Sequence, residues 1–301
     1  MSKKVIKVLS FDGGGVRALA GLIFLSNFEK QTGKKIFDEF DFFAGVSAGS
    51  LNAFGFACRG FTALETENLW SEYFLKKIKT PENFWDKYSP IQTRPKYSNK
   101  GRIEVLKQIF SDIKLGDSMK PAITLAYDVE SRRPRILSTY DTPEVSLVDA
   151  CSASSAAPIY FPTYKTQDNR WYIDGGVVTN NPALISYTEA KFLFNTDNIK
   201  VLSIGTGINT RKISGKKSSQ WGGLGWLRHD IMGIMLETQI EHKIAKDLLG
   251  SNYLRVNSPL GIVNRRLDDD SSSNIERIVD LGNNWWNIFK DSLIDFIKTD
   301  S

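Results

Sequence analysis

The sequence has few cysteines and histidines and no long apolar run. Its 301 residues contain two cysteines, Cys58 and Cys151, and two thiols without close spacing suggest neither a disulfide framework nor a zinc site. No window of about 20 apolar residues exists, so no transmembrane helix is predicted. The apolar run near the N-terminus is interrupted by Lys7 and ended by Asp12, too short for a secretory signal peptide. We therefore expect a cytoplasmic protein.

No sign of charge dominates the composition. The chain has 39 basic and 34 acidic residues, a net charge of +5 that is spread along the sequence. We interpret this charge as a contribution to solubility with a mild preference for anionic surfaces, and we expect no nucleic-acid partner. Apolar residues make up 41% and charged residues 24%, which is typical of globular rather than disordered chains.

Strand and helix patterns alternate along the chain without a repeat or a linker. We therefore expect one domain over 1–301, with a motif-bearing part at about 6–207 and a helical part at about 208–301. Predicted strands lie at 5–11, 40–46, 122–129, 133–140, 170–176 and 199–207. One predicted helix opens at the glycine turn after the first strand and ends near residue 33. Further helices are predicted at 50–60, 63–78, 101–113, 228–249 and 274–298. The order strand, turn, helix at the start indicates a layered βαβ-type fold.

Ser47 is the candidate nucleophile, because it lies between two glycines in Gly45-x-Ser47-x-Gly49. The pattern alone is weak, but here it falls between a predicted buried strand and a predicted helix. A sharp elbow at that junction needs residues without bulk on both sides of the serine. The helix N-terminus would favour a developing negative charge, and the backbone N–H of Ala48 is a natural oxyanion donor. A tight turn without chemistry is the alternative.

Two kinds of base could activate this serine. A histidine is the usual partner, and His229 and His242 both lie in or beside a late helix. His242 falls on an apolar face, where a core position is the commoner outcome, although the order Ser47, Asp174, His242 permits a conventional triad. The other candidate is Asp174 itself, which ends a predicted strand and precedes two glycines. An aspartate there can approach another loop closely, whereas an Asp-Gly turn is the structural alternative.

Three consecutive glycines, residues 13–15, follow the first predicted strand and open a helix. Their N–H groups suit an anion or oxyanion. The spacing up to Ala18 also matches a dinucleotide fingerprint, with Asp38 and Asp41 roughly where a ribose-binding acid is expected. That alternative makes no use of Ser47 or Asp174. A non-enzymatic binding module is the remaining possibility.

Taken together, the motifs resemble those of the patatin-like phospholipases. The sequence contains DGGGVR, GVSAG and DGG in this order, and the likeness continues through YDVESRRPRILSTY, SASSAAPIYFPTY, DGGVVTNNPAL, VLSIGTG, WGGLGWL and NYLRV. The resemblance covers about residues 6–286. It implies a three-layer α/β/α fold with a mainly parallel central sheet. It also implies hydrolysis of acyl esters in phospholipids and other acyl lipids, by a Ser-Asp dyad without histidine.

Carried onto this chain, the resemblance implies Ser47 as nucleophile and Asp174 as its partner. The implied oxyanion hole contains Gly13, Gly14, Gly15 and Ala48, and the implied supporting residues are Arg17, Gly45, Gly49, Gly175 and Gly176. Ala18 departs from the family, where many members have glycine, and a small packing change is expected. The scheme requires no metal or cofactor. The acidic segment 268–274 lacks the spacing of a calcium loop, so a solvated loop is expected.

Lipid must reach such a site from an aggregate. The segment 211–235 combines basic residues with Trp221, Trp226 and an apolar run, features of an element that contacts a membrane surface. Trp285 and Trp286 form a second candidate. Since tryptophans at helical spacing more often lie in a core, core positions are the alternative for both pairs.

Overall fold

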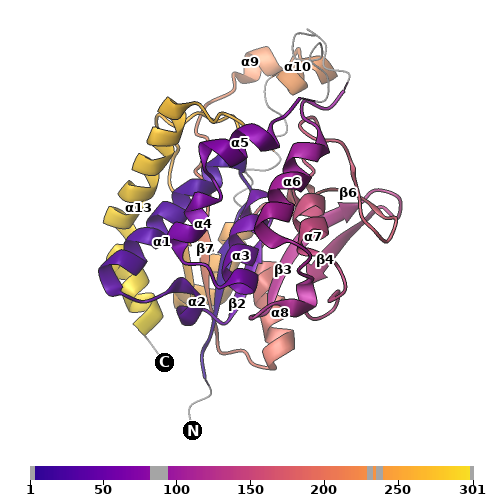
Figure 1. Ribbon diagram of the computed structural model, residues 1–301. Helices are drawn as coiled ribbons and strands as arrows, with labels where there is room; N and C mark the ends of the chain where they lie inside the picture. Colours follow the sequence, from indigo (N-terminus) through magenta and orange to yellow (C-terminus); the bar gives the residue numbers. More distant parts are fainter. Residues whose placement is uncertain (1–3, 82–93, 229–232, 235–239, 299–301) are drawn as a thin grey trace.

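Eight strands form one sheet in the computed structural model, which describes residues 4–81, 94–228, 233–234 and 240–298 (Figure 1). The order is β5-β6-β3-β2-β1-β7-β8, and β4 also pairs with β3. The strands are β1 (Ile6–Phe11), β2 (Phe42–Gly45), β3 (Ala122–Asp128), β4 (Arg133–Ser138), β5 (Tyr164–Lys165), β6 (Trp171–Asp174), β7 (Ile199–Ile204) and β8 (Tyr253–Val256). The pairs β3-β2, β2-β1, β1-β7 and β7-β8 are parallel. Strands β4 and β6 both pair antiparallel with β3, and β5 pairs antiparallel with β6. This confirms the predicted mainly parallel sheet.

The register of the central strands brings three loops to one edge. Phe11 at the end of β1 pairs with Gly45 at the end of β2 and with Ile204 at the end of β7. Because these strands are parallel, their carboxyl ends meet at the same edge, which is where open α/β sheets place their ligands. The glycines after β1 and the serine after β2 therefore emerge side by side.

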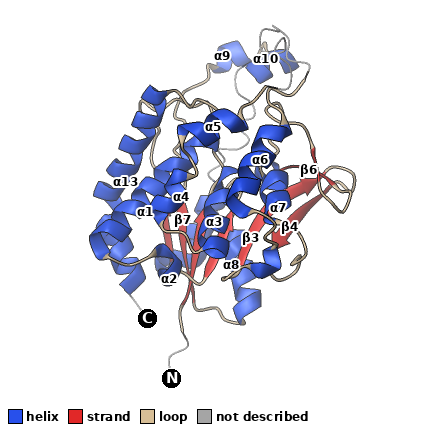
Figure 2. Cartoon of the chain, viewed as in Figure 1, coloured by secondary structure: helices blue, strands red, loops and turns tan. Residues whose placement is uncertain are grey.

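Helices cover both faces of the sheet (Figure 2). One face packs against α1 (Leu19–Thr32), α3 (Ala48–Arg59), α7 (Leu147–Ser154) and α13 (Ser272–Lys298), and the other against α8 (Ala183–Phe194) and α12 (Ile240–Leu249). The neighbours Leu9 and Val8 of β1 point into these two separate clusters, as alternation along a strand requires. The predicted three-layer arrangement of helices around a central sheet is confirmed.

The predicted helix at 63–78 is divided into two. Thr62 and Glu65 form a capping box that begins α4 (Ala63–Asn68), and the chain turns before α5 (Glu72–Ile78). The helix predicted at 101–113 is α6 (Asn99–Phe110). Of the helix predicted at 228–249, the structure contains α12, preceded by the short α9 (Gly215–Ser218) and α10 (Gly223–Arg228); residues 229–232 and 235–239 lie outside the described part. The short helix α2 (Ile36–Glu39) precedes β2.

The suggestion that Trp285 and Trp286 contact a membrane is wrong. Both belong to α13, which packs along α1, and their relative exposures are 0% and 9%. The Trp285 Nε1–H donates to Ser258 Oγ at 2.8 Å, and the ring of Trp286 lies 5.8 Å from that of Phe24. Their helical spacing thus reflects a core stripe. None of the helices in the described residues is long and apolar enough to cross a bilayer.

Candidate active site

Ser47 lies at a strained elbow between β2 and α3. Its φ is 54° and its ψ is −126°, a conformation that costs a non-glycine residue about 1–3 kcal/mol. A Cβ on Gly45 would lie 2.1 Å from the carbonyl oxygen of Gly49, and a Cβ on Gly49 would lie 2.6 Å from that of Phe11. Glycine is therefore required at both positions. The Ser47 N–H donates to Ser154 Oγ at 2.9 Å.

Asp174 ends β6 and faces this serine. The hydroxyl of Ser47 donates to Asp174 Oδ2 at 2.6 Å, and the N–H of Gly176 donates to Oδ1 at 2.7 Å. A Cβ on Gly175 would lie 2.2 Å from the carbonyl oxygen of Leu125 on β3. Gly176 thus orients the carboxylate of Asp174, while Gly175 lets the chain pass close to β3.

Burial dominates the electrostatics of this carboxyl group. Asp174 is 5% exposed, and burial raises its pKa from 3.8 to about 6. The hydrogen bonds from Ser47 and Gly176 and the positive charge of Arg102 act in the opposite direction and lower the pKa. The carboxylate is therefore a stronger base than an exposed aspartate, yet it is still mostly ionised at pH 7.

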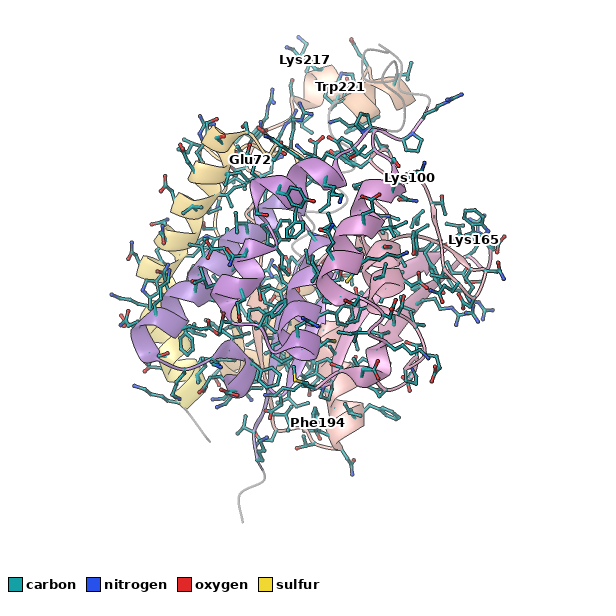
Figure 3. All side chains as sticks on the ribbon, in the orientation of Figure 1. Glu72, Lys100, Lys165, Phe194, Lys217 and Trp221 are labelled. Carbon is teal, nitrogen blue, oxygen red and sulfur yellow. The ribbon has the colours of Figure 1, made fainter. Side chains whose placement is uncertain are left out.

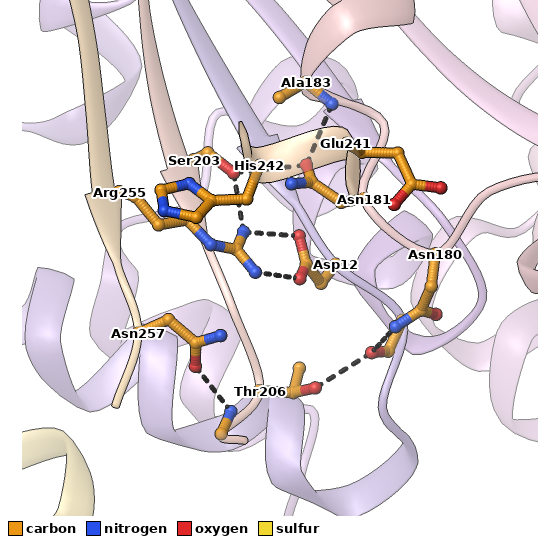
Figure 4. A network of polar contacts seen from close by, with 12 residues as sticks. Asp12, Asn180, Asn181, Ala183, Ser203, Thr206, Glu241, His242, Arg255 and Asn257 are labelled. Carbon is orange, nitrogen blue, oxygen red and sulfur yellow. Dashed lines mark hydrogen bonds and ion pairs between the residues drawn. The ribbon is translucent and has the colours of Figure 1, made fainter. Parts of the chain in front are cut away.

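The first carbonyl group of the glycine loop after β1, that of Gly13, is fixed by two hydrogen bonds. The carbonyl oxygen of Gly13 accepts Thr206 Oγ1–H at 2.9 Å and Asn180 Nδ2–H at 3.0 Å (Figure 4). Because the C=O and N–H of a trans peptide point in opposite directions, the N–H of Gly14 is directed away from Thr206 and Asn180. A Cβ on Gly13 would lie 3.1 Å from Ser47 Cβ, so the loop runs directly beside the serine.

The next peptide is oriented in the same way. The carbonyl of Gly14 accepts the backbone N–H of Arg17 at 3.2 Å and its Nε–H at 3.5 Å, so the N–H of Gly15 is directed away from Arg17. Gly15 has φ 56°, a conformation that favours glycine. Ala18, the position where many family members have glycine, is buried at the end of this 3₁₀ turn.

Gly13 differs from the other predicted donors. Its N–H donates to the carbonyl of Asn180 at 3.1 Å, so Gly13 shapes the loop but offers no N–H to an oxyanion. Within the implied oxyanion hole, this contact separates Gly13 from Gly14 and Gly15. Ala48, in contrast, is the first residue of α3, where an N–H has no acceptor within the helix.

A cavity of about 140 Å³ opens beside Ser47. Its wall is mostly apolar and includes Val16, Leu51, Trp70, Leu75, Leu106 and Phe161. Polar groups from Lys79, Tyr97, Arg102 and Asp268 complete the lining. An apolar chain therefore has a binding space that begins at the candidate nucleophile.

A buried ion pair supports the glycine loop. The Arg255 guanidinium binds Asp12 with both ends of its fork, Nη1 to Oδ1 at 2.8 Å and Nη2 to Oδ2 (Figure 4). Arg255 Nη1 also donates to Ser203 Oγ at 2.7 Å. Asp12 directly precedes the glycines, so the pair fixes the start of the loop to β7 and β8. Sequence reasoning missed Arg255, since about 240 residues separate it from Asp12.

Residues 9–187 match the sequence model of the family described as "Patatin-like phospholipase". The chain belongs to the patatin-like phospholipase family. It is 27% identical to "Patatin-like protein 1" of Arabidopsis thaliana, over 89% of this chain and 75% of that protein. It is 26% identical to "Patatin-04/09" of Solanum tuberosum, over 93% and 83%. Its fold is similar to that of VipD from Legionella pneumophila, with a TM-score of 0.53, 13% identity, and 96% and 67% of the two chains covered.

A Ser-Asp dyad is typical of patatin-like phospholipases, and the histidine in the described part of the chain, His242, makes its contact elsewhere. His242 Nδ1 lies 3.3 Å from the hydroxyl of Tyr253, on α12 beside Arg255 (Figure 4). Among the described residues, the hydrogen bonds of Ser47 and Asp174 involve no histidine. The alternative triad with His242 therefore has no support in these contacts. His229 lies outside the described residues.

The dinucleotide alternative also fails on geometry in this patatin-like chain. Asp38 lies in α2, and Asp41 accepts Lys4 Nζ–H at 2.6 Å and the N–H of Lys7 at 3.0 Å. Both aspartates precede β2, whereas the glycine loop follows β1, and the two strands are parallel. The acids and the glycines therefore lie at opposite edges of the sheet.

The acidic segment 268–274 is more than the solvated loop that was expected. Asp268 binds Lys96, accepts the Tyr97 hydroxyl at 2.7 Å and pairs with Arg266 at 3.2 Å, and its side chain is 7% exposed. Next to it, the carbonyl of Leu267 accepts the N–H of Val16 at 2.9 Å. The chain at Leu267, directly before the segment, thus packs against the end of the glycine loop. In the described part of the chain, no cluster of three metal-ligating side chains occurs.

Proposed function

We propose that this protein hydrolyses fatty-acyl esters of phospholipids and related lipids, with Ser47 as nucleophile and Asp174 as base. Family membership makes the protein a lipid acyl hydrolase. The observation that supports these residue roles is the 2.6 Å hydrogen bond between Ser47 Oγ and Asp174 Oδ2 at the end of an apolar cavity.

The acylation step uses the strained elbow. Ser47 Oγ attacks the ester carbonyl carbon while its proton moves to Asp174 Oδ2, and the carbonyl oxygen becomes an oxyanion. The N–H groups of Gly14, Gly15 and Ala48 stabilise that charge. Removing one such donor typically costs about 10²–10³ in rate. The carbon–oxygen bond to the alcohol then breaks, the alcohol takes the proton from Asp174, and an acyl-serine remains.

Deacylation reverses the proton transfers. Asp174 accepts a proton from water, the hydroxide attacks the acyl-serine carbonyl, and the proton returns to Ser47 as the fatty acid leaves. Burial of Asp174, which raises its pKa to about 6, brings the base closer to the operating pH than an exposed aspartate would be. The scheme needs no metal, so EDTA should leave the rate on a monomeric ester unchanged.

Product analysis tests this proposal. A mixture of phospholipids is incubated with the wild type, Ser47→Ala and Asp174→Asn, and the released fatty acids and lysophospholipids are measured by mass spectrometry. Matched controls are Ser273→Ala and Asp247→Asn, both at exposed helical positions. We expect both products from the wild type and the controls and neither from the two site variants. Equal release by the wild type and Ser47→Ala would overturn the proposal.

We also propose that α9 and α10 contact the membrane surface that supplies the lipid. Lys216 and Lys217 lie in α9, Leu224 of α10 is 81% exposed, and the rings of Trp221 and Trp226 meet edge to face at 5.2 Å. Figure 3 draws Lys217 and Trp221 at the outer end of the molecule. This combination of exposed apolar and basic side chains suits an anionic leaflet.

A further inference from the structure

Arg102 is a buried cation beside the proposed dyad. It projects from α6, is 3% exposed and lines the same cavity as Ser47. Its Nη1 donates to the carbonyl of Ser155 and, at 3.3 Å, to the Ser155 hydroxyl, while Nη2 donates to Asn99 Oδ1 at 2.7 Å. The guanidinium centre lies 4.4 Å from the ring centroid of Phe161. Within the described residues, these contacts of Arg102 include no ion pair with a carboxylate.

The segment that Arg102 binds contacts both members of the dyad. Ser154 Oγ accepts the N–H of Ser47 at 2.9 Å, and the carbonyl of Ala156 accepts the N–H of Asp174 at 3.0 Å. Ser155, the residue between them, is the one whose carbonyl Arg102 holds. Three consecutive residues at the end of α7 therefore set the spacing between the nucleophile and the base, and the guanidinium fixes the middle one.

We propose that Arg102 is a positioning residue for the acyl-transfer reaction: it fixes residues 154–156, and through them the backbones of Ser47 and Asp174, and it keeps a positive charge near the Asp174 carboxylate. This inference rests on the proposed function and names a residue that the Ser-Asp dyad scheme does not include. The rigid, planar guanidinium of arginine can bind a carbonyl, pack on an aromatic ring and carry a positive charge at the same time. Lysine would keep the charge but not this geometry.

The charges around Arg102 support its electrostatic role. Burial lowers the pKa of Arg102 to about 10, against the opposing effects of Asp174, Tyr164 and Cys151, so the guanidinium stays charged at pH 7. Tyr164 and Cys151 are themselves neutral there, because burial raises the pKa of both. Asp174 is therefore the ionised group that benefits from the positive charge, which lowers its pKa.

The test compares kcat, KM and the pH profile of four purified variants on a monomeric p-nitrophenyl ester. Arg102→Met should lower kcat by about 10- to 100-fold through misplacement of the dyad and move the acidic limb of kcat/KM to higher pH by about 1 unit. Arg102→Lys keeps the charge, so its acidic limb should stay in place while kcat is only partly restored. Asn99→Ala removes one hydrogen bond of the Arg102 guanidinium, so it should lower kcat without moving the acidic limb of the pH profile. Lys107→Met, on the exposed side of α6, should match the wild type.

The outcomes separate this inference from the function on which it rests. A folded Arg102→Met with the kcat and pH profile of the wild type would overturn the role of Arg102. If Arg102→Met does not fold, as judged by near-UV circular dichroism, wild-type kcat in both Arg102→Lys and Asn99→Ala would overturn it instead. Activity that survives in Ser47→Ala would sink the proposed function, whatever Arg102 does.

Discussion

Ser47 and Asp174 are joined by a direct 2.6 Å hydrogen bond, although 127 residues separate them in the chain. The elbow after β2 presents the hydroxyl, and the end of β6 presents the carboxylate. The antiparallel pairing of β6 with β3, itself parallel to β2, brings the two together. Since the carboxylate already meets the hydroxyl, proton transfer between them needs no intervening ring nitrogen.

The first prediction follows from that contact. Ser47→Ala and Asp174→Asn should each lower kcat on a p-nitrophenyl ester by at least about 10⁴-fold, because Ser47 and Asp174 are the donor and acceptor of the same proton and each variant removes one of them. Circular dichroism should show an unchanged fold. His242→Ala should keep kcat within about tenfold of the wild type, and a loss of about 10³ without unfolding would instead support a histidine-dependent mechanism.

The second prediction concerns pH. Asp174 must be ionised to accept a proton, and burial raises its pKa to about 6. Since protonation removes the base, kcat/KM should fall as pH decreases through about 6, by about tenfold per unit below it. Initial rates between pH 4 and pH 8 measure this limb. An acidic limb centred near 4, the value of an exposed aspartate, would contradict the assignment of Asp174 as the base.

Much of this site could be predicted because its signals are local. The elbow at Ser47 depends on two glycines within two residues of it, and the glycine loop directly follows an apolar strand. The helices α7 and α8 were not predicted: α7 has small residues buried all round, and α8 follows Pro182 with no marked apolar stripe. Patterns of period 3.6 require one polar face, which α7 lacks.

The supporting residues were missed for a different reason. Thr206 and Asn180 bind the glycine loop, Arg255 binds Asp12 directly before it, and Arg102 binds Ser155 beside the residues that contact the dyad. These tertiary contacts join residues that lie 50 to 250 positions apart in the sequence. No spacing rule connects them. The two readings left open for Trp285 have a related cause, since an apolar helical stripe has the same sequence pattern whether it faces a core or a membrane.

The third prediction tests the orientation of the glycine loop. Thr206→Val keeps the shape of the buried side chain but removes its hydrogen bond to the carbonyl of Gly13. With that peptide less firmly held, the N–H of Gly14 should be poorly aimed, and kcat should fall about tenfold with little change in KM. Thr188→Val, on the exposed surface of α8, is the matched control. Equal kcat in both variants would show that Asn180 alone holds the loop.

The fourth prediction concerns the ion pair below that loop. Arg255→Met leaves Asp12 buried without its partner, which should lower the free energy of unfolding by about 3–5 kcal/mol. Urea unfolding followed by tryptophan fluorescence measures the loss, and Arg133→Met at an exposed position of β4 is the control. Adding Asp12→Asn should recover part of the stability, because the uncompensated charge is removed. Equal stabilities of Arg255→Met and the wild type would argue that water replaces the guanidinium.

The last prediction separates membrane contact from chemistry. Replacing Lys216, Lys217 and Trp221 by Gln, Gln and Ala should reduce hydrolysis of anionic vesicles while sparing a monomeric ester, because docking precedes the reaction. Each basic residue near a charged leaflet contributes about 1 kcal/mol, so vesicle affinity should fall about tenfold or more at moderate salt. High salt should reduce wild-type activity on vesicles in the same way, since screening shortens the reach of the field.

The matched control for this experiment carries Lys30→Gln and Lys35→Gln, two exposed positions in the last turn of α1 and directly before α2. Helix α2 lies at the opposite end of the molecule from α9 and α10 (Figure 1). It changes the net charge by the same amount, so a general effect of charge would lower vesicle activity equally in both variants. An effect confined to the variant in α9 would locate the docking surface there. Equal losses on vesicles and on the monomeric ester would mean that α9 shapes the active site or the core instead, and the docking proposal would be rejected.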